Sequence, residues 1–196
     1  MDPLQFRLRD LSQPRGREVV ERLARLMKWE PHPSPALGAR ANVARGRGMA
    51  YIHYKHNETF VAMGMDVEVD RRSGAIQVLR VACVHDCGLM INPDAVRAQV
   101  EGNILQTLSR TLHEETTFDR NHVTSVDWTG YPLLRFPEVP RLEIELVQRL
   151  DQPPLGAGEA ASAPVPAALA NAVFDATGVR VRAVPLTREK VKSLFA

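Results

Sequence analysis

The sequence predicts an α+β fold, in which helices pack against a mixed or antiparallel sheet. Residues 59–70 alternate apolar and polar side chains, and a β-rich run at residues 75–85 follows after a short turn. Such alternation is typical of strands, whereas a helix needs apolar residues three and four positions apart. That helical spacing occurs in residues 92–114 and again in residues 165–177. Strand-like runs followed by helical ones favour a sheet covered by helices.

An amphipathic helix is expected near the N-terminus, over residues 17–29. Its apolar side chains fall on one stripe, with arginines and glutamates opposite. Three prolines between positions 31 and 35 then exclude a helix and favour an extended connection. We therefore predict an N-terminal segment of a helix and a proline-rich linker (residues 1–44), followed by one C-terminal domain (residues 45–196). The apolar stripe consists of Val19, Val20, Leu23, Leu26 and Met27.

Residues 59–70 form the first strand of an expected hairpin. The turn at residues 71–74 ends in glycine and joins this strand to the run at residues 75–85, so the two should pair antiparallel. Because only alternate residues of the first strand are apolar, one buried face is expected. The buried face would hold Val61, Met63, Met65, Val67 and Val69, and the open face Ala62, Gly64, Asp66, Glu68 and Asp70.

The clearest helix signal begins at Asn92 and Pro93. Asparagine is a favoured N-cap residue, and proline suits the first helical position because its missing N–H needs no partner there. The helix is expected to run to about Glu114. Its apolar residues are Val96, Val100, Ile104, Leu108 and Leu112.

The remaining elements are shorter. Gly178 follows an apolar helical run and is a typical helix end, and Thr187 is a typical helix start. The expected elements are extended runs at 116–123 and 141–150, a helix at 165–177, a strand at 179–182 and a last helix after Thr187.

Composition and charge exclude several classes of function. The chain has 196 residues, of which 44% are hydrophobic and 24% charged, and its formal net charge is +2. These values are typical of a folded protein and do not support binding to nucleic acid or to an anionic membrane. No long apolar run and no signal peptide are evident, so a soluble, cytoplasmic chain is expected, with a periplasmic location left open for a parent enzyme.

Histidine and cysteine spacing predicts no metal site. Cys83 and Cys87 are too few for a disulfide scaffold and do not form a CxxC motif, so we interpret both as structural thiols. The histidines lack a tight ligand spacing and are expected on the surface or in loops. A hydrolase built on Ser125, Asp127 and His122 is set aside because no Gly-x-Ser-x-Gly turn is present. The histidines considered are His53, His56, His85, His113 and His122.

A small-residue loop ends in one carboxylate and is the strongest candidate for chemistry. Gly156, Ala157 and Gly158 precede Glu159, just upstream of the expected helix at residues 165–177. Glycine permits close approach of a bulky ligand to the backbone. Taken alone, however, these few residues favour a purely structural loop, because Gly-x-Gly is common in turns.

The run PLGAGEAASAPVPAALANAVFDATGVRVRAVPLT (residues 154–187) resembles the C-terminal signature of the molybdopterin-binding subunit of xanthine and aldehyde oxidoreductases. The similarity is strongest to the isoquinoline 1-oxidoreductase beta-subunit type. Further matching segments are DCG with INP at residues 86–93, AQVEGNILQTLS at residues 98–109, YPLLR at residues 131–135 and DPLQFRLRDL at residues 2–11.

This resemblance implies a molybdenum cofactor-binding domain and assigns roles to individual residues. Glu159 would be the catalytic base, and Gly156, Ala157 and Gly158 would form a cofactor-binding loop. Gln99 would contact the pterin through its amide, and Gly102, one turn further on, would let the ring or a neighbouring loop lie against the helix. The metal would be held by the pterin dithiolene and by no side chain. Unlike the family, which usually has proline after the glutamate, this chain has Ala160.

The same resemblance implies a larger assembly around this chain. Met1 would lie well inside a long subunit, so the chain would supply half of the cofactor cradle and be inactive alone. Partners would be the remainder of the molybdenum-binding subunit and an iron–sulfur subunit, and substrates would be small aldehydes or N-heterocycles, hydroxylated with water as the oxygen source. The alternative is a non-catalytic scaffold or interaction domain that binds no cofactor by itself and self-associates as a homo-oligomer.

Overall fold

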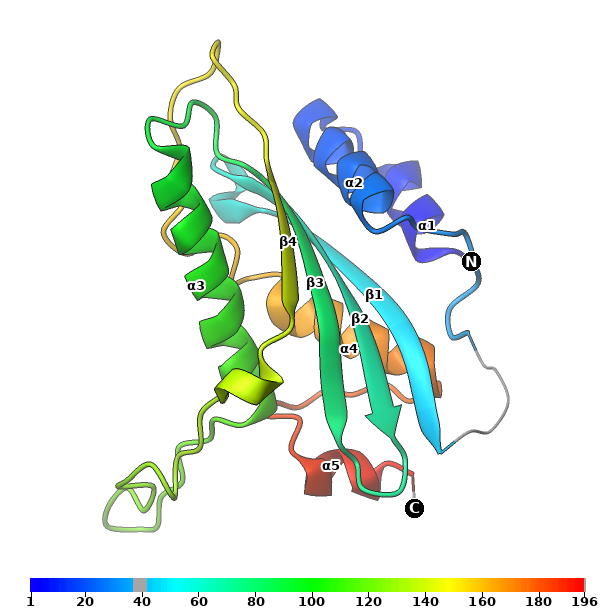
Figure 1. Cartoon of the computed structure of the whole chain (residues 1–196), viewed down its shortest axis with the longest axis vertical. Helices are drawn as coiled ribbons and strands as arrows, with labels where there is room; N and C mark the ends of the chain where they lie inside the picture. The colour runs from blue at the N-terminus through cyan, green and yellow to red at the C-terminus, as the bar shows by residue number, and fades with distance from the viewer. Residues whose placement is uncertain (37–41, 196) are drawn as a thin grey trace.

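The computed structural model describes residues 1–36 and 42–195, which form a four-stranded sheet with helices on both of its faces (Figure 1). The strand order is β1-β2-β3-β4; β2 is antiparallel to both of its neighbours, whereas β4 runs parallel to β3. The predicted α+β fold with a mixed sheet is therefore confirmed. The strands are β1 (Val43–His53), β2 (Phe60–Asp70), β3 (Ile76–Asp86) and β4 (Arg141–Leu146), and the helices are α1 (Pro3–Asp10), α2 (Pro14–Leu26), α3 (Pro93–Leu112), α4 (Val165–Thr177) and α5 (Arg188–Ser193).

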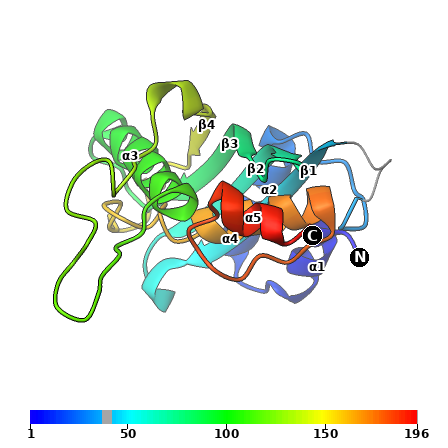
Figure 2. The ribbon, with the colours of Figure 1, turned by 90° about the horizontal axis from the view of Figure 1, so that it is seen from below.

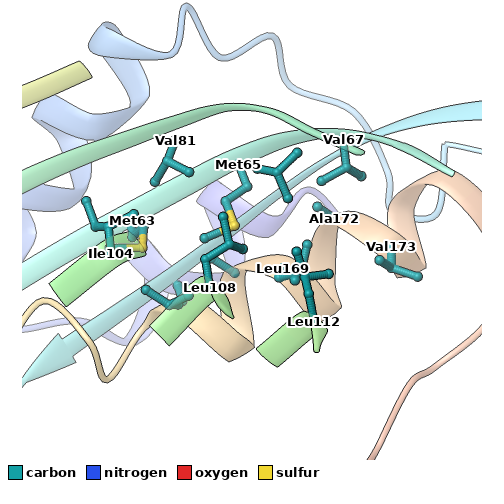
Figure 3. Packing of buried hydrophobic residues seen from close by; sticks show 14 of the residues in the cluster. Met63, Met65, Val67, Val81, Ile104, Leu108, Leu112, Leu169, Ala172 and Val173 are labelled. Carbon is teal, nitrogen blue, oxygen red and sulfur yellow. The ribbon is translucent and has the colours of Figure 1, made fainter. Parts of the chain in front are cut away.

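Helices α3 and α4 cover one face of the sheet, which we call the α3/α4 face. Figure 3 shows Met65 of β2 beside Leu108 of α3 and Leu169 of α4, and all three side chains are fully buried. Burying such apolar surface supplies most of the favourable free energy of folding. Other members of this core include Val61, Met63, Val67, Val81, Ile104, Ala172 and Val173.

Two glycines of β1 lie directly beneath α4. A Cβ atom on Gly48 would overlap the backbone nitrogen of Ala172, and one on Gly46 would overlap the carbonyl oxygen of the same residue. Any side chain at these positions would push the helix away, since interiors are close-packed. The glycines therefore set the distance between β1 and α4.

Helix α2 covers the opposite face, which we call the α2 face. The predicted amphipathic stripe is confirmed, since it packs against Ala62, Ala82 and Val84 of the sheet. The expectation that β2 has one open face is wrong at Ala62, which is 0% exposed, and at Gly64, which lies under Met27. The small size of these two residues lets α2 pack on this face. The stripe contributes Val19, Val20, Leu23 and Met27.

Three predicted helix ends are confirmed by their hydrogen bonds or dihedral angles. Asn92 caps α3, because its Oδ1 accepts a hydrogen bond from the Ala95 N–H at 3.0 Å. Gly178 ends α4 with a φ of 77°, in the left-handed region that favours glycine. Thr187 begins α5 by accepting a hydrogen bond from Lys190 N at 3.3 Å.

Two predicted strands are wrong. Residues 116–123 belong to an excursion between α3 and β4 (residues 113–140), which extends away from the sheet in Figure 2 and contains one isolated bridge, from Phe118 to Val123. Residues 179–182 form irregular chain after α4. Both runs have strand-like residues, but a strand also needs a neighbour that pairs with it. In addition, β4 ends at Leu146, earlier than the predicted residue 150.

The N-terminal third contains two elements that were not predicted, α1 and β1. Both α1 and α2 precede the described part of the predicted linker, and residues 37–41 of that linker lie outside the described residues. Strand β1 then adds the first edge of the sheet, beside β2. The segment before residue 45 thus contacts the same sheet as the rest of the chain.

Candidate functional site

The loop between β4 and α4 carries Glu159 and rests on the turn that follows β3. Leu155 N–H donates to the carbonyl oxygen of Cys87 at 2.8 Å. Gly88 has a φ of 77°, and a Cβ atom there would overlap the carbonyl oxygen of Pro153. Glycine is therefore required at this turn both by its backbone angle and by the contact with the loop.

A buried carboxylate anchors the same turn to α2 and to the segment after β4. The side chain of Asp86 is 0% exposed and pairs with Arg15 at 2.5 Å and with Arg149 at 3.0 Å, while accepting a hydrogen bond from Gly88 N at 3.1 Å. Burial raises the pKa of Asp86, but the hydrogen bonds from Arg15, Gly88 and Arg149 outweigh burial and leave it below its usual value. The carboxylate therefore stays charged and holds three segments together.

Asn103 joins helix α3 to the Glu159 loop. Its amide nitrogen donates to the carbonyl oxygen of Gly158 at 2.9 Å and to that of Gln99 at 2.5 Å, and its Oδ1 accepts from the Ser162 hydroxyl at 2.9 Å. One nearly buried amide thus brings the backbone of Gln99 next to the loop. Sequence reasoning missed Asn103, although it lies in a segment that carried the family resemblance.

Glu159 presents an exposed carboxylate at the end of this loop. Its Oε1 accepts a hydrogen bond from the hydroxyl of Tyr54, in the short 3-10 turn η1 (Tyr54–His56) after β1. This hydrogen bond, assisted by desolvation and by the nearby negative charge, raises the pKa of Tyr54 to about 12. Sequence reasoning missed Tyr54, because β1 itself was not predicted.

The other predicted site residues lie around the point where α3 meets the loop. The side chain of Gln99 is exposed on α3, and Gly102 follows it one turn later with no atom within 4 Å of where a Cβ would lie. Gly158 is equally open, whereas Gly156 approaches Glu58 and Ala157 is half-buried. An exposed amide beside two open backbone stretches fits a flat polar ring such as a pterin. The residues present therefore fit the cofactor that the sequence implied.

His85 contradicts the expectation that the histidines lie on the surface or in loops. It lies on β3 with 0% exposure, and its register opposite Val61 places it on the α3/α4 face. Within residues 1–36 and 42–195, neither ring nitrogen has a hydrogen-bond partner. Burial lowers the pKa of His85 to about 4, so the ring is neutral near pH 7.

Both cysteines are free and buried, as expected for structural thiols. Burial raises the pKa of Cys83 to about 12, so this thiol is not a nucleophile near pH 7. The described residues contain no group of three or more histidine, cysteine, aspartate or glutamate side chains that could hold a metal ion. No helix in the described part of the chain is long and apolar enough to cross a membrane.

Comparison with known proteins supports the geometry of this site. Residues 17–140 match the family described as molybdopterin cofactor-binding domain. The chain is 44% identical to one of the subunits of nicotinate dehydrogenase from Pseudomonas putida, over 98% of this chain and 17% of that protein. It is 33% identical to the beta-subunit of isoquinoline 1-oxidoreductase from Brevundimonas diminuta, over 94% of this chain and 23% of that protein.

A solved structure gives the same result. Quinoline 2-oxidoreductase from Pseudomonas putida 86 matches with a TM-score of 0.65 and 30% identity, over 70% of this chain and 18% of that one. The chain thus spans 17% and 23% of the two curated relatives. It belongs to the molybdopterin cofactor-binding domain family of the xanthine oxidase and aldehyde oxidase type.

Proposed function

We propose that this chain forms half of the cofactor cradle of a molybdenum hydroxylase and that Glu159 is the catalytic base. The observation that carries the proposal is an exposed carboxylate on a loop that Asn103 fastens to α3, next to the open surface at Gln99 and Gly102. When bound, the molybdenum cofactor supplies the oxidation chemistry, with water as the oxygen source. The protein then has to hold the cofactor and to move a proton.

Holding falls to α3 and the loop. The amide of Gln99 both donates and accepts hydrogen bonds, so it can match the polar edge of a pterin ring. Gly102 and Gly158 leave room for the ring against the backbone, with Gly156 and Ala157 completing the loop. Glu159 takes up the proton, and a positioned general base of this kind typically contributes about 10²- to 10⁴-fold in rate.

The substrate and the partners are inferred from the relatives. By name, nicotinate dehydrogenase, isoquinoline 1-oxidoreductase and quinoline 2-oxidoreductase act on N-heteroaromatic compounds. We propose that the complete enzyme hydroxylates N-heterocycles or aldehydes. The remainder of the molybdenum-binding subunit would complete the cradle, with residues 45–196 as the cofactor-binding domain. An iron–sulfur subunit would carry electrons away, because two buried cysteines cannot supply the four ligands of a cluster.

Replacing Glu159 with glutamine in the complete enzyme tests the catalytic role. Glu159→Gln keeps the size of the side chain but cannot take up a proton, so turnover should fall at least about 10²-fold. Molybdenum content, measured by metal analysis, should stay unchanged. The matched control is Glu115→Gln, which removes an exposed glutamate that pairs with Lys190 at 3.0 Å. Near-normal turnover of Glu159→Gln would refute the assignment.

The holding role of Gln99 is tested separately. Gln99→Ala in the complete enzyme should lower the molybdenum and pterin content of the purified protein, because it removes the amide beside the open face of α3. Gln106→Ala, a change at another exposed glutamine of the same helix, should leave both contents unchanged. Equal cofactor content in the two variants would count against a contact between Gln99 and the pterin.

A non-catalytic interaction module is the second candidate, and the excursion at residues 113–140 favours it. Large exposed apolar side chains of this kind often mark sites of association. Metal and pterin analysis of this chain after addition of cofactor, together with sedimentation, separates the two candidates: a cofactor-free oligomer supports the module. The exposed residues include Phe118, Val126, Trp128 and Phe136, with exposures of 77%, 77%, 74% and 97%.

A further inference from the structure

The segment between β1 and β2 contacts the Glu159 loop at two separate points. The Thr59 hydroxyl donates to the carbonyl oxygen of Gly156 at 2.5 Å, at the start of the small-residue loop. The Tyr54 hydroxyl donates to Glu159 at its end. The two donors are themselves linked, since Tyr54 N–H donates to the carbonyl oxygen of Thr59 at 2.8 Å. This segment, residues 54–59, therefore holds both ends of the loop that carries the candidate base.

The backbone of residues 54–59 adopts an uncommon conformation. Lys55 and His56 have φ values of 49° and 64°, in the left-handed region that residues with a Cβ seldom adopt. Such angles persist only where the surrounding contacts determine them. The flanking residues are well packed, because the ring of His53 stacks on that of Phe60 with centroids 4.1 Å apart. The turn thus directs Tyr54 toward the loop from a rigid base.

We propose that Tyr54 is a positioning residue for Glu159, holding one carboxylate oxygen and leaving the other to accept a proton. The inference rests on the proposed function of Glu159 but concerns a residue that the family resemblance did not single out. Glu159 Oε1 accepts the hydrogen bond, so Oε2 is the oxygen directed to the reaction. A hydroxyl donor also favours the charged carboxylate, which is the form a base must have.

The tyrosine keeps its proton throughout the working range. With the pKa of Tyr54 at about 12, the hydroxyl remains a donor at any pH at which the enzyme would function. Removing the hydroxyl should therefore act on Glu159 alone, by freeing its rotation and by raising the pH at which it takes up a proton.

The first experiment measures the titration of Glu159 itself in this chain, without cofactor. The side-chain ¹³C signal of Glu159 is assigned by its loss in Glu159→Gln and followed against pH. In Tyr54→Phe, which keeps the ring and removes only the hydroxyl, the pKa of Glu159 should rise by about half a unit or more. Circular dichroism of the variant verifies that the fold is kept. An unchanged titration would overturn the proposal.

A second tyrosine–glutamate pair provides the matched control. The Tyr131 hydroxyl donates to Glu114 Oε2 at 2.9 Å in the excursion, far along the chain from Glu159. Tyr131→Phe should alter the titration of Glu114 and leave that of Glu159 unchanged. If both tyrosine variants moved Glu159 equally, the effect of Tyr54 would be nonspecific and the proposal would fail.

The complete enzyme supplies the kinetic readout. Tyr54→Phe should lower kcat ~10-fold, leave KM unchanged, and move the acid limb of the kcat/KM profile to higher pH. An unmoved acid limb would overturn the positioning role. The two hypotheses fail separately: normal turnover of Glu159→Gln removes the catalytic base, whereas an unchanged Glu159 titration in Tyr54→Phe removes only the role of the tyrosine.

Discussion

The two faces of the sheet are packed in different ways. On the α3/α4 face, long apolar side chains of β2 fill the space to two helices, and glycines of β1 let the α4 backbone approach closely. On the α2 face, one helix lies on Ala62, Gly64 and Ala82, and ion pairs such as Arg80 with Asp66 continue the layer where the apolar contacts end. The first face is thus determined by backbone contacts and the second by side chains, so the same substitution should have different costs on the two faces.

The largest effect is expected at Gly48, on the α3/α4 face. In Gly48→Ala the new methyl group would meet backbone atoms of Ala168 and Ala172, and these cannot move unless α4 moves as a whole. We expect a loss of about 3 kcal/mol or more in the free energy of unfolding. Urea denaturation followed by circular dichroism measures this loss. Near-normal stability would show that α4 is not held at the distance described.

Local signals were sufficient for the elements whose ends are written in neighbouring residues. Helix α3 followed from Asn92 and Pro93, and the β2–β3 hairpin from alternation and a glycine turn. By contrast, β1 contains Gly46 and Gly48, which weaken a strand signal and are explained only by α4, more than a hundred residues later. Tertiary contact thus overrode local preference in β1.

The candidate site shows the same division. Glu159 and Gln99 were predicted from motifs that can be read along the chain. Asn103 and Tyr54 were not, because their roles depend on which segments meet in space: α3 with the loop, and the end of β1 with Glu159. A sequence motif identifies the group that does chemistry more readily than the groups that hold it in place.

A pH-dependent loss of stability is expected from His85, a polar residue on the apolar face. Its folded pKa of about 4 lies below the value near 6.5 of an unfolded histidine, so the unfolded state binds more protons between these values. Stability is therefore fully present above about pH 6.5 and falls toward pH 4, with about 2 kcal/mol lost between pH 7 and pH 5. Urea denaturation at several pH values gives the slope.

The non-titrating variant His85→Gln isolates this contribution. It should flatten the decline between pH 7 and pH 5, whereas His122→Gln, at a largely exposed histidine, should keep the slope of the natural chain. The same slope in all three proteins would mean that His85 takes up its proton without unfolding, and that the α3/α4 face is more open at this point than the packing indicates.

The smallest effect is expected at Gly64, on the α2 face. A methyl group in Gly64→Ala would meet the Sδ, Cε and Cγ atoms of Met27, which lie in a flexible side chain rather than in a backbone. Methionine adapts readily to irregular space, so the cost should be about 1 kcal/mol. A double-mutant cycle with Met27→Ala measures the coupling: shortening the side chain should remove most of the cost of the added methyl group. A loss as large as that of Gly48→Ala, unrelieved by Met27→Ala, would show that α2 is held as rigidly as α4 and that the two faces do not differ.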